Sequence, residues 1–188
     1  MKKFNLSSIT SRYRANLVLN IFERWFKKGD KILDVGSGTG VIAYMLKSQL
    51  EIEIIVCDVK NYLLYDVPFV KIKNDKLPFR NNTFSIVLLI DVLHHIDKLK
   101  QEQLIIECLR VAKSIFIFES EPTFSGKVAD IILNKLHYSD LNTPLTFRKT
   151  HEWKQLLKKL HLKYDYIKLD KPLWYPFSHI AFKVSKDR

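Results

Sequence analysis

Cysteines are rare in this chain, and long apolar runs are absent. Cys57 and Cys108, the two cysteines, both lie in apolar segments, which favours core thiols in a reducing compartment over a disulfide or a metal pair. No apolar run approaches ~18 residues, so no membrane span is expected. The first fourteen residues are polar and basic and have no apolar stretch, unlike a secretory signal. These absences predict a globular, cytoplasmic protein.

Glycine is scarce as well, and its placement is informative. The chain has five glycines, and three of them are Gly36, Gly38 and Gly40. A short apolar strand over 32–35 precedes them, and a helix over 41–50 follows. Glycine is used where φ must be positive or where a ligand must approach the backbone. The pattern predicts a nucleotide-type site at the carboxyl end of a parallel strand, because an ordinary tight turn needs only one glycine.

The glycine spacing narrows the choice of nucleotide. The dinucleotide pattern G-x-G-x-x-G would place its third glycine at Val41, and the phosphate loop G-x-x-x-x-G-K-[ST] is absent. The observed G-x-G-x-G, with Asp34 two positions before it, resembles motif I of the class I S-adenosylmethionine-dependent methyltransferases. This resemblance implies S-adenosylmethionine as the cofactor. It also implies that the following residues contact it: Asp34, Gly36, Ser37, Gly38 and Gly40.

A second carboxylate follows the next predicted strand. The apolar run 54–57 ends at Asp58, 18 residues after Gly40. A carboxylate at that position can accept hydrogen bonds from both ribose hydroxyls of a nucleoside. We therefore expect Asp58, with Val59 beside it, to bind the cofactor; the alternative is a surface acid at the end of a strand.

Three further segments extend the resemblance over roughly residues 30–119. Leu-Pro-Phe at 77–79, Phe-Ser-Ile-Val at 84–87 and Val-Leu-His-His at 92–95 resemble the small-molecule methyltransferases of the ubiquinone/menaquinone type, methyltransferase type 11. The chain departs from that pattern at Ser85, where the usual residue is Asp. The acid before Leu-Pro-Phe also lies two residues closer than usual. The adenine-side contact is therefore open between Asn74 and Asp75, and the resemblance assigns Ile90 and Asp91 to the cofactor site as well.

Strands alternating with helices predict an α/β, doubly wound, Rossmann-like fold in one domain over 1–188. The resemblance implies seven strands in the order 3-2-1-4-5-7-6, with the last antiparallel and helices on both faces. Residues 1–28 hold an N-terminal helix, 30–119 the cofactor-binding core, and 120–188 the acceptor side. Ser11 and Thr150 are the expected N-caps of helices over 11–27 and 150–160.

Methyl transfer from a sulfonium needs positioning and exclusion of water more than a catalytic group. A base is useful only if the acceptor is a hydroxyl, an enol or a carbon acid. His95, ahead of His94, is the candidate base, with a packing role as the alternative. Glu119 and Glu121 either line the acceptor pocket or lie on the surface. No metal is expected, because adjacent histidines on a regular element point apart and no second ligand motif is present.

The charge is concentrated at the two ends. Residues 1–30 carry seven Lys/Arg against two acids, residues 146–188 eleven against four, and the middle thirteen against fourteen. This distribution suits an anionic partner such as RNA, or simply lysine-rich exposed helices. The stretch at 91–94 lacks the proline motif of enzymes that methylate base amines, so nucleic acid is possible but not favoured. A small-molecule methyl acceptor is preferred, and an inactive partner subunit is the remaining alternative.

The sequence leaves open the roles of two groups of residues near the expected acceptor side. Tyr13 and Arg14 of the first helix either face the cofactor or serve packing and the surface. The aromatic residues of 120–180 suit a flat or greasy acceptor such as an aromatic metabolite or a lipid, or plain packing. They are Phe124, Tyr138, Phe147, Trp153, Trp174, Tyr175 and Phe177.

Overall fold

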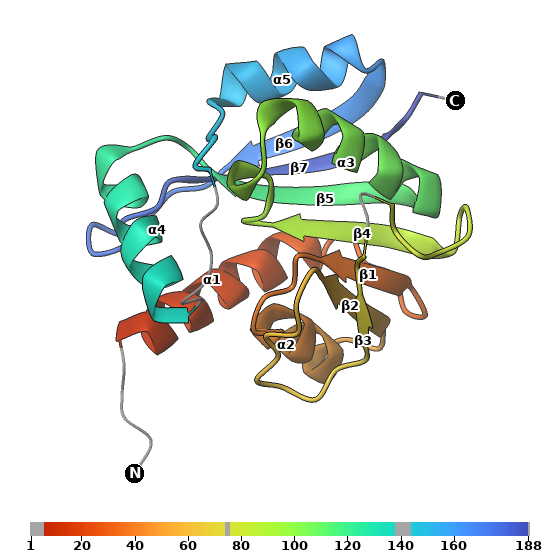
Figure 1. Ribbon diagram of the computed structural model, residues 1–188, viewed down its shortest axis with the longest axis horizontal. Helices are drawn as coiled ribbons and strands as arrows, with labels where there is room; N and C mark the ends of the chain where they lie inside the picture. The colour runs from red at the N-terminus through yellow and green to blue at the C-terminus, as the bar shows by residue number, and fades with distance from the viewer. Residues whose placement is uncertain (1–5, 74–75, 138–143, 188) are drawn as a thin grey trace.

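All seven strands join a single sheet in the computed structural model, which describes residues 6–73, 76–137 and 144–187 (Figure 1). The strand order is β3-β2-β1-β4-β5-β7-β6. The strands are β1 (Lys31–Val35), β2 (Glu53–Asp58), β3 (Phe69–Lys71), β4 (Phe84–Ile90), β5 (Ala112–Ser120), β6 (Leu162–Lys168) and β7 (His179–Lys186).

The strand directions place the carboxyl ends of six strands at one edge. The pairs β1–β2, β2–β3, β1–β4 and β4–β5 are parallel, whereas β7 runs antiparallel to both β5 and β6. The predicted order and the antiparallel last strand are therefore confirmed. In such a sheet ligands bind beyond the carboxyl ends, at the point where the strand order reverses between β1 and β4.

Helices cover both faces of the sheet. One face carries α1 (Leu6–Phe22) and α2 (Val41–Gln49), and the other carries α3 (Lys98–Val111) and α5 (Thr150–Lys159). The remaining helices, α4 (Phe124–His137) and the short 3₁₀ helix η1 (Leu93–His95), lie beyond the carboxyl ends of β5 and β4 (Figure 1).

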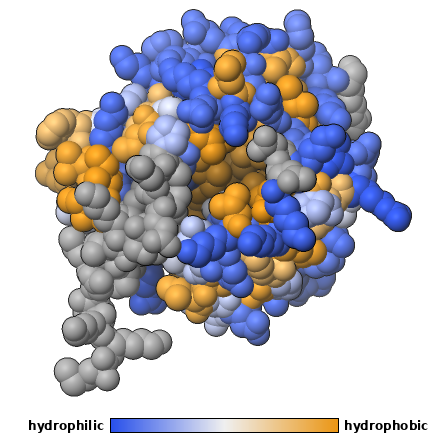
Figure 2. Space-filling view, viewed as in Figure 1, coloured by the Kyte–Doolittle hydropathy of each residue, from blue (hydrophilic) through white to orange (hydrophobic). Residues whose placement is uncertain are grey.

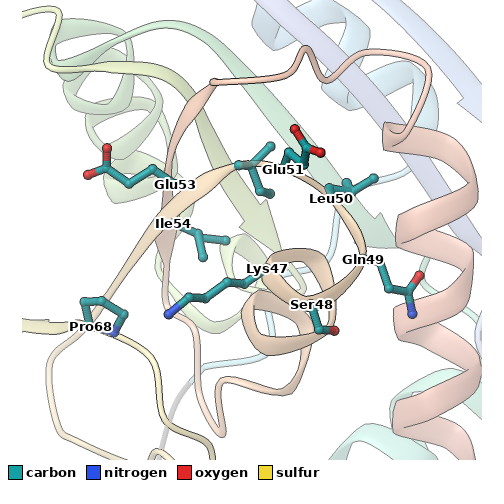
Figure 3. Close-up of a pocket in the computed structure, with 9 residues that line it drawn as sticks. Lys47, Ser48, Gln49, Leu50, Glu51, Glu53, Ile54 and Pro68 are labelled. Carbon is teal, nitrogen blue, oxygen red and sulfur yellow. The ribbon is translucent and has the colours of Figure 1, made fainter.

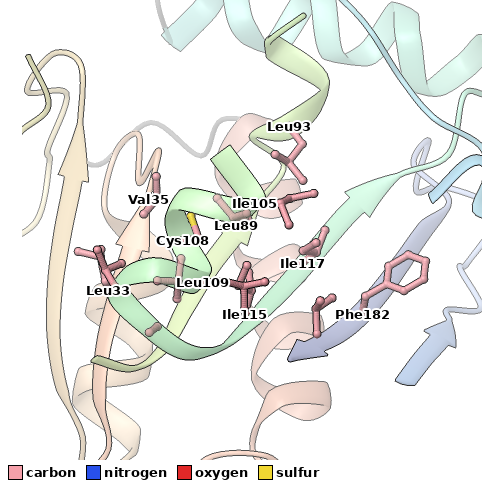
Figure 4. Packing of buried hydrophobic residues seen from close by; sticks show 14 of the residues in the cluster. Leu33, Val35, Leu89, Leu93, Ile105, Cys108, Leu109, Ile115, Ile117 and Phe182 are labelled. Carbon is pink, nitrogen blue, oxygen red and sulfur yellow. The ribbon is translucent and has the colours of Figure 1, made fainter. Parts of the chain in front are cut away.

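The central strand β4 shows why the sheet is buried on both faces. Successive side chains of a strand point to opposite faces. Val87 and Leu89 accordingly pack with α3 and α5, while Ile86 and Leu88 pack with α1 and α2. Figure 4 shows Leu89 close to Ile105 and Cys108 of α3. A strand between two helical layers needs apolar residues at every position, which explains the continuous apolar run.

Two predicted N-caps are wrong. Helix α1 begins at Leu6, so Ser11 lies inside it, and it ends at Phe22, because Trp25 and Phe26 turn to pack on Phe116. Helix α5 does begin at Thr150, but its N-cap is the preceding lysine, whose N–H donates to Glu152 Oε2 at 2.8 Å. A glutamate in the third helical position closes the cap from within the helix.

Both cysteines are buried free thiols, in agreement with the sequence analysis. The cytoplasmic location stays a prediction. Among the described helices, none combines the length and the apolar character needed to span a bilayer.

Candidate functional site

The turn between β1 and α2 is built on three glycines in the left-handed region. Gly36, Gly38 and Gly40 have φ values of 73°, 53° and 75°. A Cβ on Gly36 would lie 2.5 Å from Val92 Cγ2, and one on Gly40 would lie 2.6 Å from Leu63 Cδ2. Both the backbone conformation and the available space therefore require glycine at these two positions.

Asp58 closes this turn from the neighbouring strand. It is the last residue of β2, and its Oδ2 accepts the Gly38 N–H at 3.0 Å while its Oδ1 accepts the Val59 N–H at 2.7 Å. Burial raises the pKa of Asp58 above its usual range, against the lowering effect of the Gly38 and Val59 N–H groups. The sequence-predicted pair of glycine turn and acid is thus in direct contact.

Asp34 is a buried carboxyl beside the same turn. It is 3% exposed, and burial, followed by the charge of Asp58, raises its pKa to about 7, against the lowering effect of Arg14. The nearby hydroxyl Oγ of Ser37 is shielded from solvent and has no hydrogen-bond partner within the described chain. A cation beside Asp34 and a polar group at Ser37 would complete the site, and S-adenosylmethionine carries an ammonium, a carboxylate and ribose hydroxyls.

Asp91 marks the carboxyl end of β4 and collects contacts from three other elements. Its backbone is left-handed, with φ 51°. Its carboxylate lies 3.1 Å from Arg14 Nη1 on α1, 3.4 Å from His179 Nε2 on β7, and 3.3 Å from Ser120 Oγ on β5. Burial opposes ionisation, but His179 and then Arg14 hold the pKa of Asp91 well below its usual range. Arg14 therefore pairs with Asp91 and is not only a surface residue.

Glu119 fixes the short helix η1 from below. Its Oε1 accepts the N–H groups of Val92 and Leu93 at 3.0 and 2.6 Å, and its Oε2 lies 2.6 Å from His94 Nδ1. Both Glu119 and His94 are 1% exposed. The sequence left two roles open for Glu119, a surface acid or a residue lining the acceptor pocket. The structure shows a third role, because the buried carboxylate holds the η1 backbone in place.

The two adjacent histidines of η1 lie against each other. Their ring centroids are 4.1 Å apart, because a 3₁₀ turn held by Glu119 is neither a regular α-helix nor a strand. The expectation that they point apart is wrong. Asp130 Oδ1 of α4 lies 3.5 Å from His94 Nε2 and 4.0 Å from His95 Nε2. The cluster of His94, His95 and Asp130 is hereafter the histidine cluster.

The two histidines carry different charges. Burial lowers the pKa of His94, but the carboxylates of Glu119 and Asp130 outweigh it and raise the pKa to about 10. Burial, followed by the neighbouring His94 charge, lowers the pKa of His95 to about 4. At neutral pH His95 is therefore a neutral imidazole with a lone pair on one nitrogen.

Four of the residues predicted to bind the cofactor or to act on the acceptor, Asp34, Asp58, Asp91 and His95, lie at the carboxyl ends of β1, β2 and β4 or in η1, which follows β4. Asn74 and Asp75 lie outside the described residues, Ile90 packs in the core, and Val59 is 62% exposed at the site's rim. The sequence did not indicate Asp130 and His179, which are distant in sequence from every motif. The one available signal was an acid at position 130 within an otherwise apolar helical stretch.

Figure 2 shows a hollow with an apolar floor in the middle of one face, near the place where Figure 1 draws the ends of β1 and β4. A separate open pocket lies at the opposite end of α2 and the amino end of β2, away from the glycine turn (Figure 3). Residues such as Lys47, Glu51 and Pro68 line that pocket, which contains none of the predicted site residues.

Comparison with known proteins relates the segment around the glycine turn to methyltransferases. The family model described as a methyltransferase domain matches residues 33–117. No curated protein matches the sequence. Among solved structures, a protein from Pyrococcus horikoshii OT3 superposes with a TM-score of 0.73 at 15% identity, covering 94% of this chain and 92% of that one. An S-adenosylmethionine-dependent methyltransferase from Methanosarcina mazei gives 0.68 at 16% identity, covering 88% and 96%.

A phosphoethanolamine N-methyltransferase from Haemonchus contortus, solved with S-adenosylmethionine, gives a TM-score of 0.66 at 15% identity. It covers 92% of this chain and 53% of that one. The segment that matches the family model begins in β1 and ends in β5, and so spans the glycine turn, Asp58 and η1. The family model for a methyltransferase domain thus covers these site elements but less than half of the chain, and the solved structures, at 15–16% identity, share its fold.

Proposed function

We propose that the protein transfers the methyl group of S-adenosylmethionine to a small, largely apolar acceptor that enters beside η1. In this proposal the glycine turn and Asp34 bind the methionine part of the cofactor, and Asp58 accepts hydrogen bonds from the ribose. The adenine side is assigned to the segment holding Asn74 and Asp75. The acceptor then lies beyond Asp91, where a methyl group leaving the sulfonium can be met in line.

The observation that supports a small acceptor is the closure around Asp91 and η1. Arg14 of α1, His179 of β7 and Asp130 of α4 approach Asp91 and His94 from three different elements, at 3.1, 3.4 and 3.5 Å. An acceptor position bordered by three elements in this way limits the entry of water and suits a molecule of metabolite size better than a folded RNA. We therefore place nucleic acid second.

The exposed apolar side chains of α4 support an apolar acceptor. Of the aromatic residues singled out in the sequence, Phe147, Trp153, Tyr175 and Phe177 are buried and serve packing, whereas Phe124 and Trp174 are 87% and 56% exposed. Figure 2 shows apolar atoms gathered over α4, which also exposes Val128, Ile131 and Ile132. Contiguous exposed apolar surface is commonly a binding surface.

The proposed catalytic role of His95 depends on the acceptor. A pKa of about 4 makes His95 a weak base at neutral pH, so it takes a proton only from an acceptor that is already acidic or acidified by another group. An amine acceptor that arrives unprotonated needs no base. His95 is then a contact residue, not a proton acceptor.

The test uses S-adenosylmethionine with a labelled methyl group and three acceptor pools from cells: metabolites and lipids, total RNA, and proteins. We expect label in the metabolite and lipid pool. An Asp58→Ala variant serves as the matched negative control, because it removes a cofactor contact and leaves the acceptor side intact. Label in RNA alone would establish the nucleic-acid alternative. Cofactor binding without label in any pool would favour the inactive partner subunit.

A further inference from the structure

We propose that the histidine cluster is a binding site for a divalent transition-metal ion, with His94 Nε2, His95 Nε2 and Asp130 Oδ1 as its ligands. Its donor atoms all lie within 4.8 Å of one another. Two imidazoles and one carboxylate are a ligand set typical of Zn²⁺, Fe²⁺ or Co²⁺, whereas Mg²⁺ and Ca²⁺ prefer oxygen ligands.

The donor separations fit a metal better than they fit direct hydrogen bonds. Metal–ligand distances of about 2.1 Å place neighbouring tetrahedral donors about 3.4 Å apart. His94 Nε2 and Asp130 Oδ1 are 3.5 Å apart, and His95 Nε2 and Asp130 Oδ1 are 4.0 Å apart. The second distance needs a shift of about half an ångström, which Asp130, a partly exposed side chain on α4, can make.

A second, independent observation is the unpartnered nitrogen of His94. Nε2 of His94 is shielded from solvent and makes no hydrogen bond within the described chain, although the side chain is only 2% exposed. A buried polar atom without a partner is costly, so it indicates a missing group. Asp130 Oδ1 lies 3.5 Å from this atom, at the limit of a hydrogen bond, and a cation bound to both atoms would lie to one side of the line that joins them.

The surroundings of His94 match those of a metal ligand. Its other nitrogen, Nδ1, lies 2.6 Å from the buried Glu119 carboxylate, and its ring stacks on Phe147 with centroids 4.6 Å apart and planes within 10°. Metal-binding histidines usually donate the second N–H to a carboxylate, which fixes the tautomer and the ring orientation. Here Glu119 fixes the tautomer of His94 and Phe147 fixes its ring orientation, so Nε2 points toward Asp130.

Two of the three ligand side chains are partly exposed. The side chains of Asp130 and His95 are 13% and 21% exposed, so solvent and small molecules reach that side of the cluster. Three protein ligands with an open position are typical of catalytic metal sites. The cluster lies at the same sheet edge as the glycine turn, since Val92, two residues before His94, occupies the space next to Gly36.

This site deepens, and rests on, the proposed methyl transfer. An acceptor hydroxyl or enol that binds the metal loses its proton to water more readily, because the metal lowers its pKa. The oxygen then forms a bond to the methyl carbon as the carbon–sulfur bond breaks, and neutral S-adenosylhomocysteine leaves. His95 is a ligand in this scheme, and the proton goes to solvent.

The experiment is a titration of the full chain, without a histidine tag and freed of metals with a chelator, by Co²⁺ alone. We expect one Co²⁺ per chain, seen by calorimetry and by visible d–d absorption. His95→Ala and Asp130→Asn should each weaken binding by at least about tenfold. These two residues are only partly buried, so the variants should fold. His151→Ala and Asp66→Asn, at exposed positions elsewhere, are the matched controls and should bind Co²⁺ like the unaltered chain.

S-adenosylhomocysteine is titrated into the same samples. Cofactor binding without Co²⁺ binding, or Co²⁺ binding that His95→Ala and Asp130→Asn do not change, would overturn the metal site and leave the proposed function standing. A protonated His94 between Glu119 and Asp130 would then be the correct description. Co²⁺ binding at these ligands in a chain that transfers no methyl group would overturn only the proposed function.

Discussion

Gly38 is the residue at which backbone conformation and ligand binding are hardest to separate. Its φ of 53° lies in the left-handed region, and its N–H is bound by Asp58. A side chain in that region costs about 1–2 kcal/mol. We therefore expect Gly38→Ala to lower the free energy of unfolding by that amount even without cofactor, and to weaken cofactor binding at least about tenfold because the turn shifts.

Gly29→Ala is the matched control for this variant. Gly29 also has a positive φ, 81°, but a Cβ there would meet no atom within 4 Å and it lies outside the cofactor turn. Melting curves of the cofactor-free proteins should show similar losses for the two variants, while calorimetry with S-adenosylhomocysteine should show a loss for Gly38→Ala alone. Equal cofactor affinity in both variants would mean that Gly38 serves only the turn.

Asp34 makes the pH dependence of cofactor binding predictable. Its pKa of about 7, set by burial and then Asp58, lies above the value of about 4 in an unfolded chain. The folded state therefore binds the extra proton, and this carboxyl's contribution to stability falls as pH rises from about 4 to 7. A cofactor ammonium beside Asp34 favours the ionised form, so binding should release a proton at pH 6.5.

Calorimetry of S-adenosylhomocysteine binding in buffers of different ionisation enthalpy measures this release. We expect a fraction of a proton released at pH 6.5 and much less at pH 8, where Asp34 is already ionised in the free protein. Asp34→Asn should abolish the difference between the two pH values. Proton uptake at pH 6.5, or a release that Asp34→Asn preserves, would contradict the assignment of Asp34 to the cofactor's charged end.

At the scale of the element, η1 depends on one buried carboxylate. Glu119 binds two backbone N–H groups and His94 Nδ1, and removing one member of a buried charged pair costs about 3–5 kcal/mol. We expect Glu119→Gln to destabilise the protein by about 3 kcal/mol, measured by urea unfolding. Glu121→Gln is the control, because that carboxylate lies nearer the surface, where it contacts Thr150 and Lys168, and should cost about 1 kcal/mol.

A small effect of Glu119→Gln, equal to that of Glu121→Gln, would show that η1 is held by its other contacts. The best candidate is Gln101 of α3, which is fully buried and donates to the carbonyl oxygen of Leu93 at 2.8 Å and to Thr146 Oγ1 at 2.9 Å.

The elements that the sequence predicts well are those with a local pattern. The buried strands appear as apolar runs and the glycine turn appears as a spacing, so the doubly wound sheet is predictable from the residues, whereas its strand order came from the resemblance to the methyltransferases. The hydrogen bond from the Gly38 N–H to Asp58 was not predicted. The geometry of η1 has no such pattern. It is fixed by Glu119, 25 residues after His94, and by Asp130 on another helix, and such long-range contacts leave no periodic trace.

Across the whole molecule, ligand binding should appear as added stability. A ligand at 100 times its Kd stabilises the folded state by about 2.7 kcal/mol, which in a chain of this size raises the melting temperature by roughly 5–11 °C. We expect this rise with S-adenosylmethionine and S-adenosylhomocysteine, and none with NAD, because Val41 stands where the dinucleotide motif needs glycine. A rise with NAD alone would contradict the cofactor assignment.

Some lysines near the C-terminal end of the chain form contacts within the protein, whether or not they also bind a partner. Lys159 of α5 pairs with Glu102 of α3 at 2.6 Å, and Lys154 lies 3.5 Å from the ring centroid of Tyr166 on β6. Exposed pairs of this kind contribute little individually. They nonetheless place part of the C-terminal positive charge against acids and aromatic rings of the same molecule. Less of this charge is then available to bind RNA.

The contact between Gly36 and Val92 has a kinetic consequence. Val92 occupies the volume that any side chain at position 36 would take, and it leads directly into the helix that carries His94 and His95. A cofactor resting on the glycine turn therefore presses on the same residue that shapes the acceptor position. We expect turnover to follow a compulsory order, cofactor first, in which an unreactive acceptor analogue inhibits uncompetitively towards S-adenosylmethionine.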